Sequence, residues 1–223
     1  MTANGALQGK ISLVLGASKG IGAGTARAFG RAGATVVLAS RDEQALNRVA
    51  DEIRSAGARA LVVPTDMGDE GQVASLVTFD EAIRVSLRGT LIAMKYEIPP
   101  MVTQGAGAIV NMSSTAGLQG VRGMGAYAAA KHGVIGATKS AALDYAAKGI
   151  RINAVLPAAI ETDMYRRFVG ENAESKAAMT AMHPIGRIGK SEEIADAAIW
   201  LSSSKSSFVT GHSLLVDGGF TAQ

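Results

Sequence analysis

The 223-residue sequence contains no cysteine, and aromatic residues make up only 4% of it. The absence of cysteine excludes disulfide bonds, thiol nucleophiles and thiolate metal ligands, and it suits a reducing cytoplasm. The three histidines, His132, His183 and His212, lie far apart in the sequence, so we expect no metal site. Because aromatic residues are scarce, the core must be built from Ala, Val, Ile and Leu.

The sequence also lacks the segments that direct a chain to a membrane or to nucleic acid. Residues 1–10 do not show the basic-then-apolar order of a signal peptide, and no apolar run approaches the ~18 residues of a membrane span. The net charge is +3, but the 22 basic residues are dispersed and no array of aromatic residues accompanies them. We therefore expect a cytoplasmic protein with no membrane or nucleic-acid partner.

What is present is an alternation of short β-branched runs with longer amphipathic or alanine-rich stretches. Strands are predicted at 11–15, 34–39, 58–63, 108–112, 150–156 and 213–216. Helices are predicted at 20–32, 42–56, 79–103, 124–148 and 191–203. Apolar strands separated by helices indicate a parallel sheet with helices on both faces. The fold predicted is a doubly wound, Rossmann-like α/β fold, with residues 1–223 as a single domain.

Three glycines at the end of the first predicted strand show a G-x-x-x-G-x-G spacing: Gly16, Gly20 and Gly22. The loop ends a strand and opens a helix, so its backbone can turn tightly and direct free N–H groups at a pyrophosphate. A tight turn alone would also use such glycines. A second strand that ends about 20 residues later favours dinucleotide binding.

The end of the second predicted strand indicates which dinucleotide is bound. An NAD site usually places a carboxylate there for the ribose 2′-hydroxyl. This sequence has Ser40 followed by Arg41, and Lys19 lies inside the glycine loop. Two cations without a carboxylate favour the 2′-phosphate of NADP. The alternative is that Arg41 only begins the next, strongly charged helix, and NAD then stays open as the cofactor.

Tyr127 and Lys131 lie four residues apart in an alanine-rich predicted helix. Residues at i and i+4 lie on the same face of a helix, so the ammonium group lies beside the phenol. The spacing also arises by chance, with the Tyr ring packed inside and the Lys extended to water. Further motifs are needed to choose between the two interpretations.

Those motifs occur in one order along the chain, and together they resemble the short-chain dehydrogenase/reductase family, in its type of about 250 residues. The resemblance covers nearly the whole chain. It rests on "GASKGIG" at 16–22, "TDMGD" at 65–69, "IVNMSSTAG" at 109–117, "YAAAK" at 127–131, "INAVLP" at 152–157 with "IET" at 160–162, and "FVTGHSLLVDGG" at 208–219.

The resemblance implies a catalytic set of Ser114, Tyr127, Lys131 and Ser86. Tyr127 would be the general acid that protonates a carbonyl oxygen during reduction, or the base in the reverse direction. Lys131 would lower the phenol's pKa of about 10 toward the working range and bind the nicotinamide ribose. Ser114 would hold the substrate oxygen. Ser86 stands where the family usually has an Asn, and this departure puts its contribution in doubt.

The resemblance also implies further contacts to the cofactor. Asp66 and Met67 match the pair at adenine, and Ile160 and Thr162 match the residues that fix the carboxamide. The predicted cofactor-binding residues are Gly16, Ser18, Lys19, Gly20, Ile21, Gly22, Ser40, Arg41, Asp66, Met67, Tyr127, Lys131, Pro157, Ile160 and Thr162.

One segment of the family pattern is missing. Only 20 positions separate Asp66 from Ser86, and neither a strand nor an Asn-Ala-Gly turn occurs between them. In the expected sheet, that strand lies next to the first strand, at the switch point where the cofactor binds. We expect that the natural polypeptide carries about 30 further residues between Val77 and Thr78, with that strand and turn among them.

The sequence thus predicts an oxidoreductase that transfers hydride between NADP(H) and a carbonyl or secondary alcohol substrate. The alternatives are a 3-oxoacyl-thioester reductase of the fatty-acid type, for which Arg122 would meet an acidic substrate, and a non-catalytic nucleotide-binding relative. Specificity should come from a substrate lid at 163–185. The charge-poor helix at 124–148 and the helix at 79–103 predict a homodimer or homotetramer.

Overall fold

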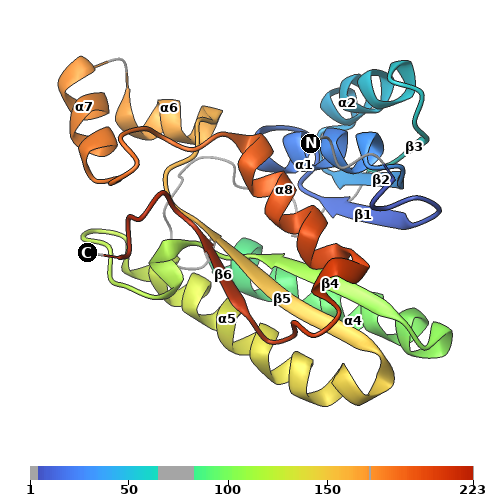
Figure 1. Cartoon of the computed structure of the whole chain (residues 1–223). Coiled ribbons are helices and arrows are strands. Elements are labelled where there is room, and N and C mark those ends of the chain that lie inside the picture. The colour runs from blue at the N-terminus through green and yellow to red at the C-terminus, as the bar shows by residue number, and fades with distance from the viewer. Residues whose placement is uncertain (1–4, 65–82, 171, 223) are drawn as a thin grey trace. The chain divides into compact units, whose positions relative to one another are not determined.

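The computed structural model describes residues 5–64, 83–170 and 172–222 (Figure 1). The described residues group into two compact units, which we treat separately. The first unit takes its residues from Met1–Asp66, Ala158–Ser203 and Val216–Gln223, and the second from Met67–Pro157 and Ser204–Leu215. In the described part of the chain, no helix has the length and apolar character needed to cross a bilayer.

The first unit contains a three-stranded parallel sheet in the order β1-β2-β3, joined by helical crossovers. Helices α6 and α7 fall within the segment that the sequence predicts as a lid. The elements are β1 (Ile11–Leu15), α1 (Gly20–Arg31), β2 (Thr35–Ser40), α2 (Glu43–Ser55), β3 (Ala60–Pro64), α6 (Asp163–Val169), α7 (Ala173–Ala181) and α8 (Ser191–Ser202).

Helix α2 shows how the sequence builds these crossovers. The Asp42 carboxylate accepts the N–H of Ala45, which satisfies one of the free donors at the start of the helix. The helix then buries residues at three- and four-residue intervals, among them Leu46, Val49 and Ile53, each at most 2% exposed. The apolar residues whose spacing predicts the helix are therefore the ones that form its buried face.

Helix α1 makes a close approach to α8 at Gly24. A β-carbon added at Gly24 would lie 2.8 Å from the Cβ of Ser191, closer than side-chain carbons pack. Only glycine therefore permits this contact between the two helices.

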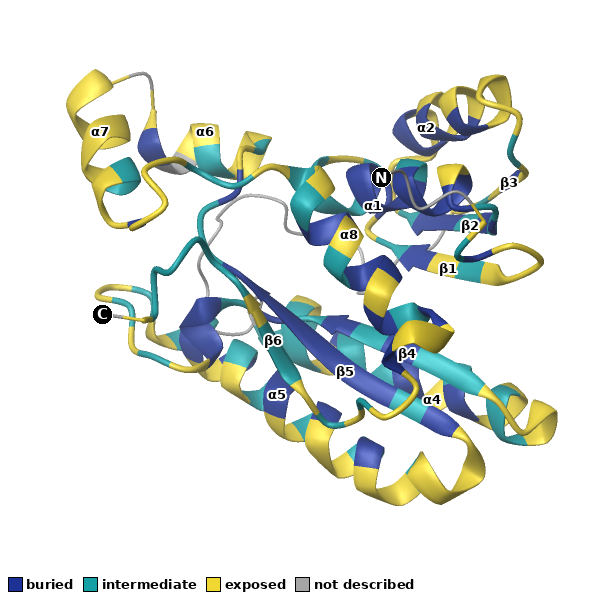
Figure 2. Cartoon of the chain, viewed as in Figure 1, coloured by how far each residue is buried: buried dark blue, intermediate teal, exposed yellow. Residues whose placement is uncertain are grey.

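The sheet of the first unit is apolar on both faces, but its two faces differ in burial (Figure 2). Val36 and Leu38 of β2 are fully buried. On the opposite face, Ile11, Leu13 and Leu61 are 77%, 46% and 56% exposed. Leu13 and Leu61 both lie in register with Val37, so they form one exposed row.

The second unit contains a second three-stranded sheet in the order β4-β5-β6, in which β4 and β5 are parallel. A short π-helical segment precedes α4. The elements are η1 (Ile83–Arg88), α4 (Gly89–Gln104), β4 (Gly107–Met112), η2 (Thr115–Gly117), α5 (Gly125–Tyr145), η3 (Ala146–Lys148), β5 (Ile150–Pro157), η4 (Ser204–Ser206) and β6 (Ser213–Val216).

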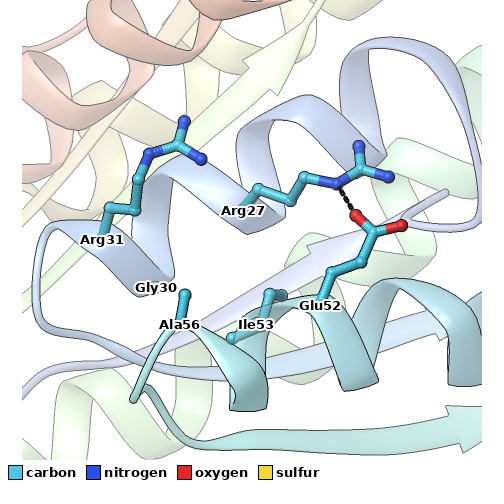
Figure 3. A pocket seen from close by; sticks show the side chains of 6 residues that line it. All are labelled: Arg27, Gly30, Arg31, Glu52, Ile53 and Ala56. Carbon is cyan, nitrogen blue, oxygen red and sulfur yellow. Dashed lines mark hydrogen bonds and ion pairs between the residues drawn. The ribbon is translucent and has the colours of Figure 1, made fainter.

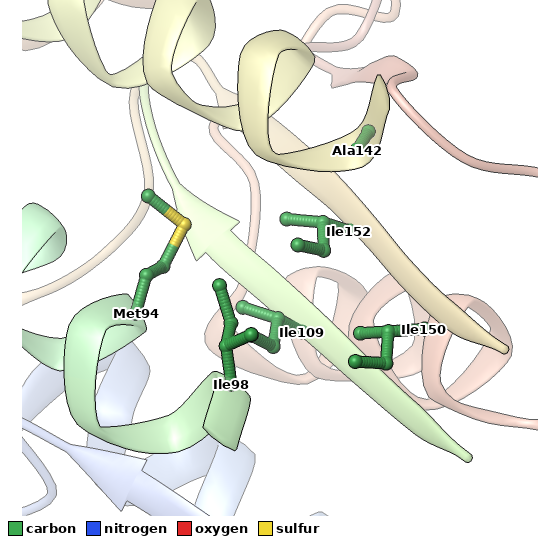
Figure 4. Close-up of a cluster of buried hydrophobic side chains, with 6 residues drawn as sticks. All are labelled: Met94, Ile98, Ile109, Ala142, Ile150 and Ile152. Atoms are coloured by element: carbon green, nitrogen blue, oxygen red, sulfur yellow. The ribbon is translucent and has the colours of Figure 1, made fainter. Parts of the chain in front are cut away.

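Helices α4 and α5 cover one face of this second sheet. Their side chains meet those of β4 and β5 in a cluster in which no side chain is more than 6% exposed (Figure 4). The cluster consists of Met94, Ile98, Ile109, Ala142, Ile150 and Ile152. The core is thus aliphatic, as the scarcity of aromatic residues predicts.

Asn153 is a buried polar residue that fixes the position of the segment before β6. Its side chain is fully buried, and its Nδ2 donates to the carbonyl of Val209 over 3.0 Å. Its Oδ1 accepts the N–H of His212, also over 3.0 Å. One amide side chain therefore satisfies two backbone groups of the 209–212 segment.

Most predicted elements are found with boundaries shifted by at most two residues, and the sequence does not predict α6 and α7. The predicted helix at 124–148 is α-helical only to Tyr145, and the one at 79–103 is described from Ile83 on, as η1 followed by α4. The sequence predicts one sheet, whereas the described strands form two sheets of three. In the described residues, β1 and β4 each border a single strand. Val77 and Thr78, between which we expect further residues, lie outside the part that the structure describes.

Candidate active site

The glycine loop of the first unit has the conformation that its spacing predicts. Gly16 and Gly20 have positive φ angles of 72° and 57°. At Gly22 a β-carbon would lie 2.2 Å from the Gly16 carbonyl oxygen, so the turn requires glycine there. Helix α1 then begins without a side-chain cap and without an acidic residue in its first turn. Such a helix start suits a phosphate group.

The end of β2 fits the ribose end of a dinucleotide. The Ser40 hydroxyl oxygen is buried and has no hydrogen-bond partner among the described residues. Arg41 is exposed and makes no ion pair within the described ranges, and the same holds for Lys19. Because α2 is capped by Asp42 and begins at Glu43, Arg41 lies outside that helix. Among the described residues, these two cations have no acidic partner, so they could meet a ligand phosphate.

The segment after β5 lies beside the glycine loop in the first unit. Thr162 caps α6, with its hydroxyl oxygen 3.4 Å from the Tyr165 nitrogen, and it donates to the Ile160 carbonyl over 3.3 Å. The Thr162 methyl carbon lies 3.6 Å from the place where a β-carbon of Gly20 would stand. Ile160 is 6% exposed and pairs with Gly189 in a parallel bridge. The first unit thus contains all the predicted cofactor contacts discussed so far: the glycine loop, Ser40, Arg41, Ile160 and Thr162. The chemistry of these residues fits an NAD(P) molecule.

The second unit brings together three of the four predicted catalytic residues. Ser114 follows β4, its hydroxyl donates to the Pro157 carbonyl over 3.5 Å, and it lowers the pKa of the Tyr127 phenol. Tyr127 and Lys131 lie one turn apart on α5, and the Lys131 Nζ is 5.6 Å from the centre of the Tyr127 ring. The chance interpretation of the Tyr and Lys spacing predicts no such grouping.

Burial dominates the electrostatics of this group. Burial raises the pKa of Tyr127, and the hydrogen bond with Ser114 offsets this only in part. Burial also lowers the pKa of Lys131 from 10.5 to about 8. The Lys131 ammonium donates to the Met112 carbonyl over 3.0 Å. The pKa of Tyr127 in this structure is thus set by burial and by Ser114, and the effect of Lys131 on the phenol stays a prediction.

Ser113, which the sequence does not single out, helps to position the lysine. It is 3% exposed, and its hydroxyl donates to the backbone carbonyl of Lys131 over 2.9 Å. Gly117 packs against the same place, since a β-carbon there would lie 2.9 Å from the Lys131 carbonyl oxygen. The only sequence signal is the paired serine, Ser113 with Ser114.

Ser86 is the fourth predicted catalytic residue. It lies in η1, which packs against α5, and the Leu87 side chain lies close to Gly133. Among the described residues the Ser86 hydroxyl makes no hydrogen bond, while its carbonyl accepts from Thr90 over 2.7 Å. The predicted adenine contacts, Asp66 and Met67, lie outside the described residues.

A shallow pocket between α1 and α2 does not coincide with any predicted site residue (Figure 3). In it, Arg27 of α1 faces Glu52 of α2, and the two form an ion pair. Its volume of about 210 Å³ is below the roughly 300–1,000 Å³ typical of ligand sites. We assign it a packing role between the two helices.

Known proteins are similar to this chain in sequence and in fold. A family model described as short chain dehydrogenase matches residues 10–79, and one described as enoyl-(acyl carrier protein) reductase matches residues 76–221. Cyclohexanol dehydrogenase of Acinetobacter sp. (strain SE19) is 38% identical over 246 residues, which cover 96% of this chain and 96% of that protein.

Solved structures agree with these matches. A Beutenbergia cavernae protein classed as an NAD(P)-dependent gluconate 5-dehydrogenase, with bound NADP at low occupancy, superposes with a TM-score of 0.92. It is 30% identical, and the match covers 100% of both chains. A Brucella melitensis 3-oxoacyl-[acyl-carrier protein] reductase with bound NAD has a TM-score of 0.85 and is 29% identical, covering 98% of this chain and 93% of that one. The chain therefore belongs to the short-chain dehydrogenase/reductase family of oxidoreductases.

Proposed function

We propose that the protein transfers hydride between NADP(H) and the carbonyl carbon of a ketone, or in reverse from a secondary alcohol. The observation that carries this proposal is the group of Ser114, Tyr127 and Lys131 in the second unit, in which the Lys131 Nζ lies 5.6 Å from the centre of the Tyr127 ring and Ser114 lowers the pKa of the phenol against the effect of burial. A hydroxyl and a phenol placed in this way can both turn to a single substrate oxygen.

The raised pKa of Tyr127 suits the role of a general acid. At neutral pH the phenol keeps its proton, so it can give that proton to the carbonyl oxygen as the oxygen gains negative charge. The reduced nicotinamide supplies the hydride that forms the new C–H bond. Ser114 donates a hydrogen bond to the same oxygen, and the Tyr127 phenolate regains its proton from water.

Lys131 assists this step by charge. Its ammonium, held by the Met112 carbonyl, stabilises the phenolate that remains after the proton has left. Because burial lowers the pKa of Lys131 to about 8, this charge is lost as the pH rises through 8. We therefore propose that reduction slows above that pH.

The preference for NADP rests on Arg41, Lys19 and Ser40. Two cations without ion-pair partners in the described part of the first unit would meet the 2′-phosphate, and the Ser40 hydroxyl would hydrogen-bond to the same ribose. The solved relatives contain NADP in one case and NAD in another, so the proposal depends on this chain's own residues.

The experiment that tests the function is a panel of ketones and secondary alcohols followed by the absorbance of the reduced nicotinamide. It includes cyclohexanol and an acetoacetyl thioester, because relatives act on cyclohexanol and on 3-oxoacyl groups. Tyr127→Phe removes the proton donor alone, so turnover should fall by at least about a hundredfold while NADP(H) binding is kept. If Tyr127→Phe turned over a substrate nearly as fast as the unmodified protein, Tyr127 would be excluded as the acid.

The same panel separates the two alternatives. Turnover of the thioester alone would favour the 3-oxoacyl-thioester reductase, and Arg122, which is exposed five residues before Tyr127, would then meet the acidic carrier. Tight binding of NADP(H) without turnover of any substrate would indicate a non-catalytic relative.

We also propose that the natural chain is longer at one internal point, between Val77 and Thr78. The alignment with cyclohexanol dehydrogenase spans 246 positions, so at least 23 of them find no residue in this 223-residue chain. The two family models meet at residues 76–79. In the described residues β1 borders one strand only, and an unpaired edge of this kind is what the loss of a neighbouring strand would leave. A natural protein with an intact mass of 22.8 kDa would refute this proposal.

A further inference from the structure

In the first unit, two residues hydrogen-bond to the backbone between Ala159 and Thr162: Gly189 and His183. Gly189 accepts the N–H of Glu161 over 2.9 Å and donates to the Ala159 carbonyl over 3.1 Å. These two bonds fix one edge of the segment. The N–H of Ala159 points elsewhere, to the Nε2 of His183 at 3.4 Å.

His183 is buried, at 3% exposed, and both of its ring nitrogens have partners. Its Nδ1 lies 2.9 Å from the Met179 carbonyl oxygen, near the end of α7. A carbonyl can only accept and a backbone N–H can only donate. These two bonds assign the donor role to Nδ1 and the acceptor role to Nε2, which accepts from Ala159.

The C-terminal segment closes over this imidazole. The Phe220 ring lies 5.3 Å from the His183 ring, and the Gly218 carbonyl accepts the N–H of Ile185 over 3.1 Å. Asp217 holds the end of the segment, since its carboxylate accepts from the backbone and hydroxyl of Thr221. His183 thus joins three parts of the chain: α7, the C-terminal segment and the backbone at Ala159.

We infer that His183 is a positioning residue: through its Nε2 acceptor it sets the backbone of residues 159–162, and thereby how that segment holds the nicotinamide end of the cofactor. The inference rests on the proposed function for its effect on the cofactor. Its effect on the Ala159 amide is independent of any ligand. A residue that only fills the core would need no acceptor at Nε2.

The test uses the full natural protein and four variants. His183→Met keeps the volume and removes both polar atoms, whereas His183→Gln places an oxygen near the Nε2 position. His183→Asn places its oxygen or nitrogen only near the Nδ1 position. His212→Met is the matched control, because the His212 side chain is exposed and only its backbone atoms are bonded in the described residues.

The first readout is hydrogen exchange of the Ala159 amide without ligand. It should be about tenfold faster in His183→Met and His183→Asn, and within about threefold of the unmodified protein in His183→Gln and His212→Met. Equal exchange in His183→Gln and His183→Asn would overturn the inference. If His183→Met does not fold, the comparison of His183→Gln with His183→Asn still tests whether an acceptor at the Nε2 position protects the Ala159 amide.

The second readout is the Kd of NADP+ compared with that of adenosine 2′,5′-bisphosphate, which lacks the nicotinamide end. Loss of the acceptor should weaken NADP+ binding about tenfold and leave the bisphosphate within about twofold. Equal weakening of both, or of neither, would overturn the inference. An unmodified protein that binds neither ligand would refute the proposed function instead, and the exchange experiment would still test the role of His183.

Discussion

Replacing Lys131 with methionine should stabilise the fold at neutral pH, although it removes a residue of the proposed catalytic set. Burial lowers the pKa of Lys131 from 10.5 to about 8, so the folded protein holds the ammonium at a cost that the unfolded chain does not have. At 1.36 kcal/mol per pKa unit, this cost is roughly 3.4 kcal/mol below pH 8. Methionine keeps most of the apolar stem and carries no charge.

The gain is partly offset by one lost hydrogen bond. The Lys131 Nζ donates to the Met112 carbonyl over 3.0 Å, and a bond from a charged donor contributes about 1.5–3 kcal/mol. We therefore expect Lys131→Met to raise the free energy of unfolding by about 1 kcal/mol at pH 7. Between pH 8 and pH 10.5 the unfolded state binds more protons, so the unmodified protein gains stability there as the pH rises. The difference between the two proteins should consequently shift by about 2.5 kcal/mol against the variant between pH 7 and pH 10.

Urea unfolding followed by circular dichroism at pH 7, 8.5 and 10 measures this shift. Lys176→Met is the matched control, since Lys176 is an exposed lysine of α7 with no ion pair in the described ranges, and its effect should not vary with pH. A stability difference for Lys131→Met that is the same at all three pH values would show that burial does not disfavour the ammonium. Turnover should be lost in this variant at every pH.

The other predictions concern cofactor choice, the core and assembly. NADPH should bind more tightly than NADH, and Arg41→Asp should reverse the preference, as measured by competitive titration at low salt; equal affinities in the unmodified protein would exclude the phosphate contact. Asn153→Leu should lower the free energy of unfolding by about 2–5 kcal/mol, because it removes the partner of both the Val209 carbonyl and the His212 N–H, and a loss below 1 kcal/mol in urea unfolding would contradict this. Light scattering at micromolar concentration should give a dimer or tetramer, since the exposed face of α5 carries few charges and an 84% exposed Leu143; a monomeric mass would refute the assembly.

The sequence predicts the strands and most helices well, because apolar periodicity and caps are local properties. Asp42 caps α2 and glycines close the loop before α1, and each of these signals lies within a few residues of its effect. The sequence does not predict α6 and α7, because their first turns are fixed by the side chains of Thr162 and Asn172, which accept backbone N–H groups, and because α7 buries none of its residues.

The sequence shows which residues the structure groups around Tyr127, but it does not show their pKa shifts. The Tyr127 and Lys131 spacing is visible in the sequence, but their pKa shifts depend on how deeply α5 is buried, and burial is a property of the whole unit. The role of His183 was equally hidden. Its partners, Met179, Ala159 and Phe220, are set by the chain returning on itself, and no local pattern marks them.

The contact between Gly24 and Ser191 has a consequence for how this sequence can change over generations. Every single-base change in a glycine codon that alters the amino acid either adds a β-carbon or ends the chain. At Gly24 that carbon would stand 2.8 Å from the Cβ of Ser191, so even alanine, the smallest replacement, separates α1 from α8. Drift at this position is therefore blocked by packing alone, whatever substrate or cofactor selection acts upon, and any lineage that loses Gly24 must first move the start of α8.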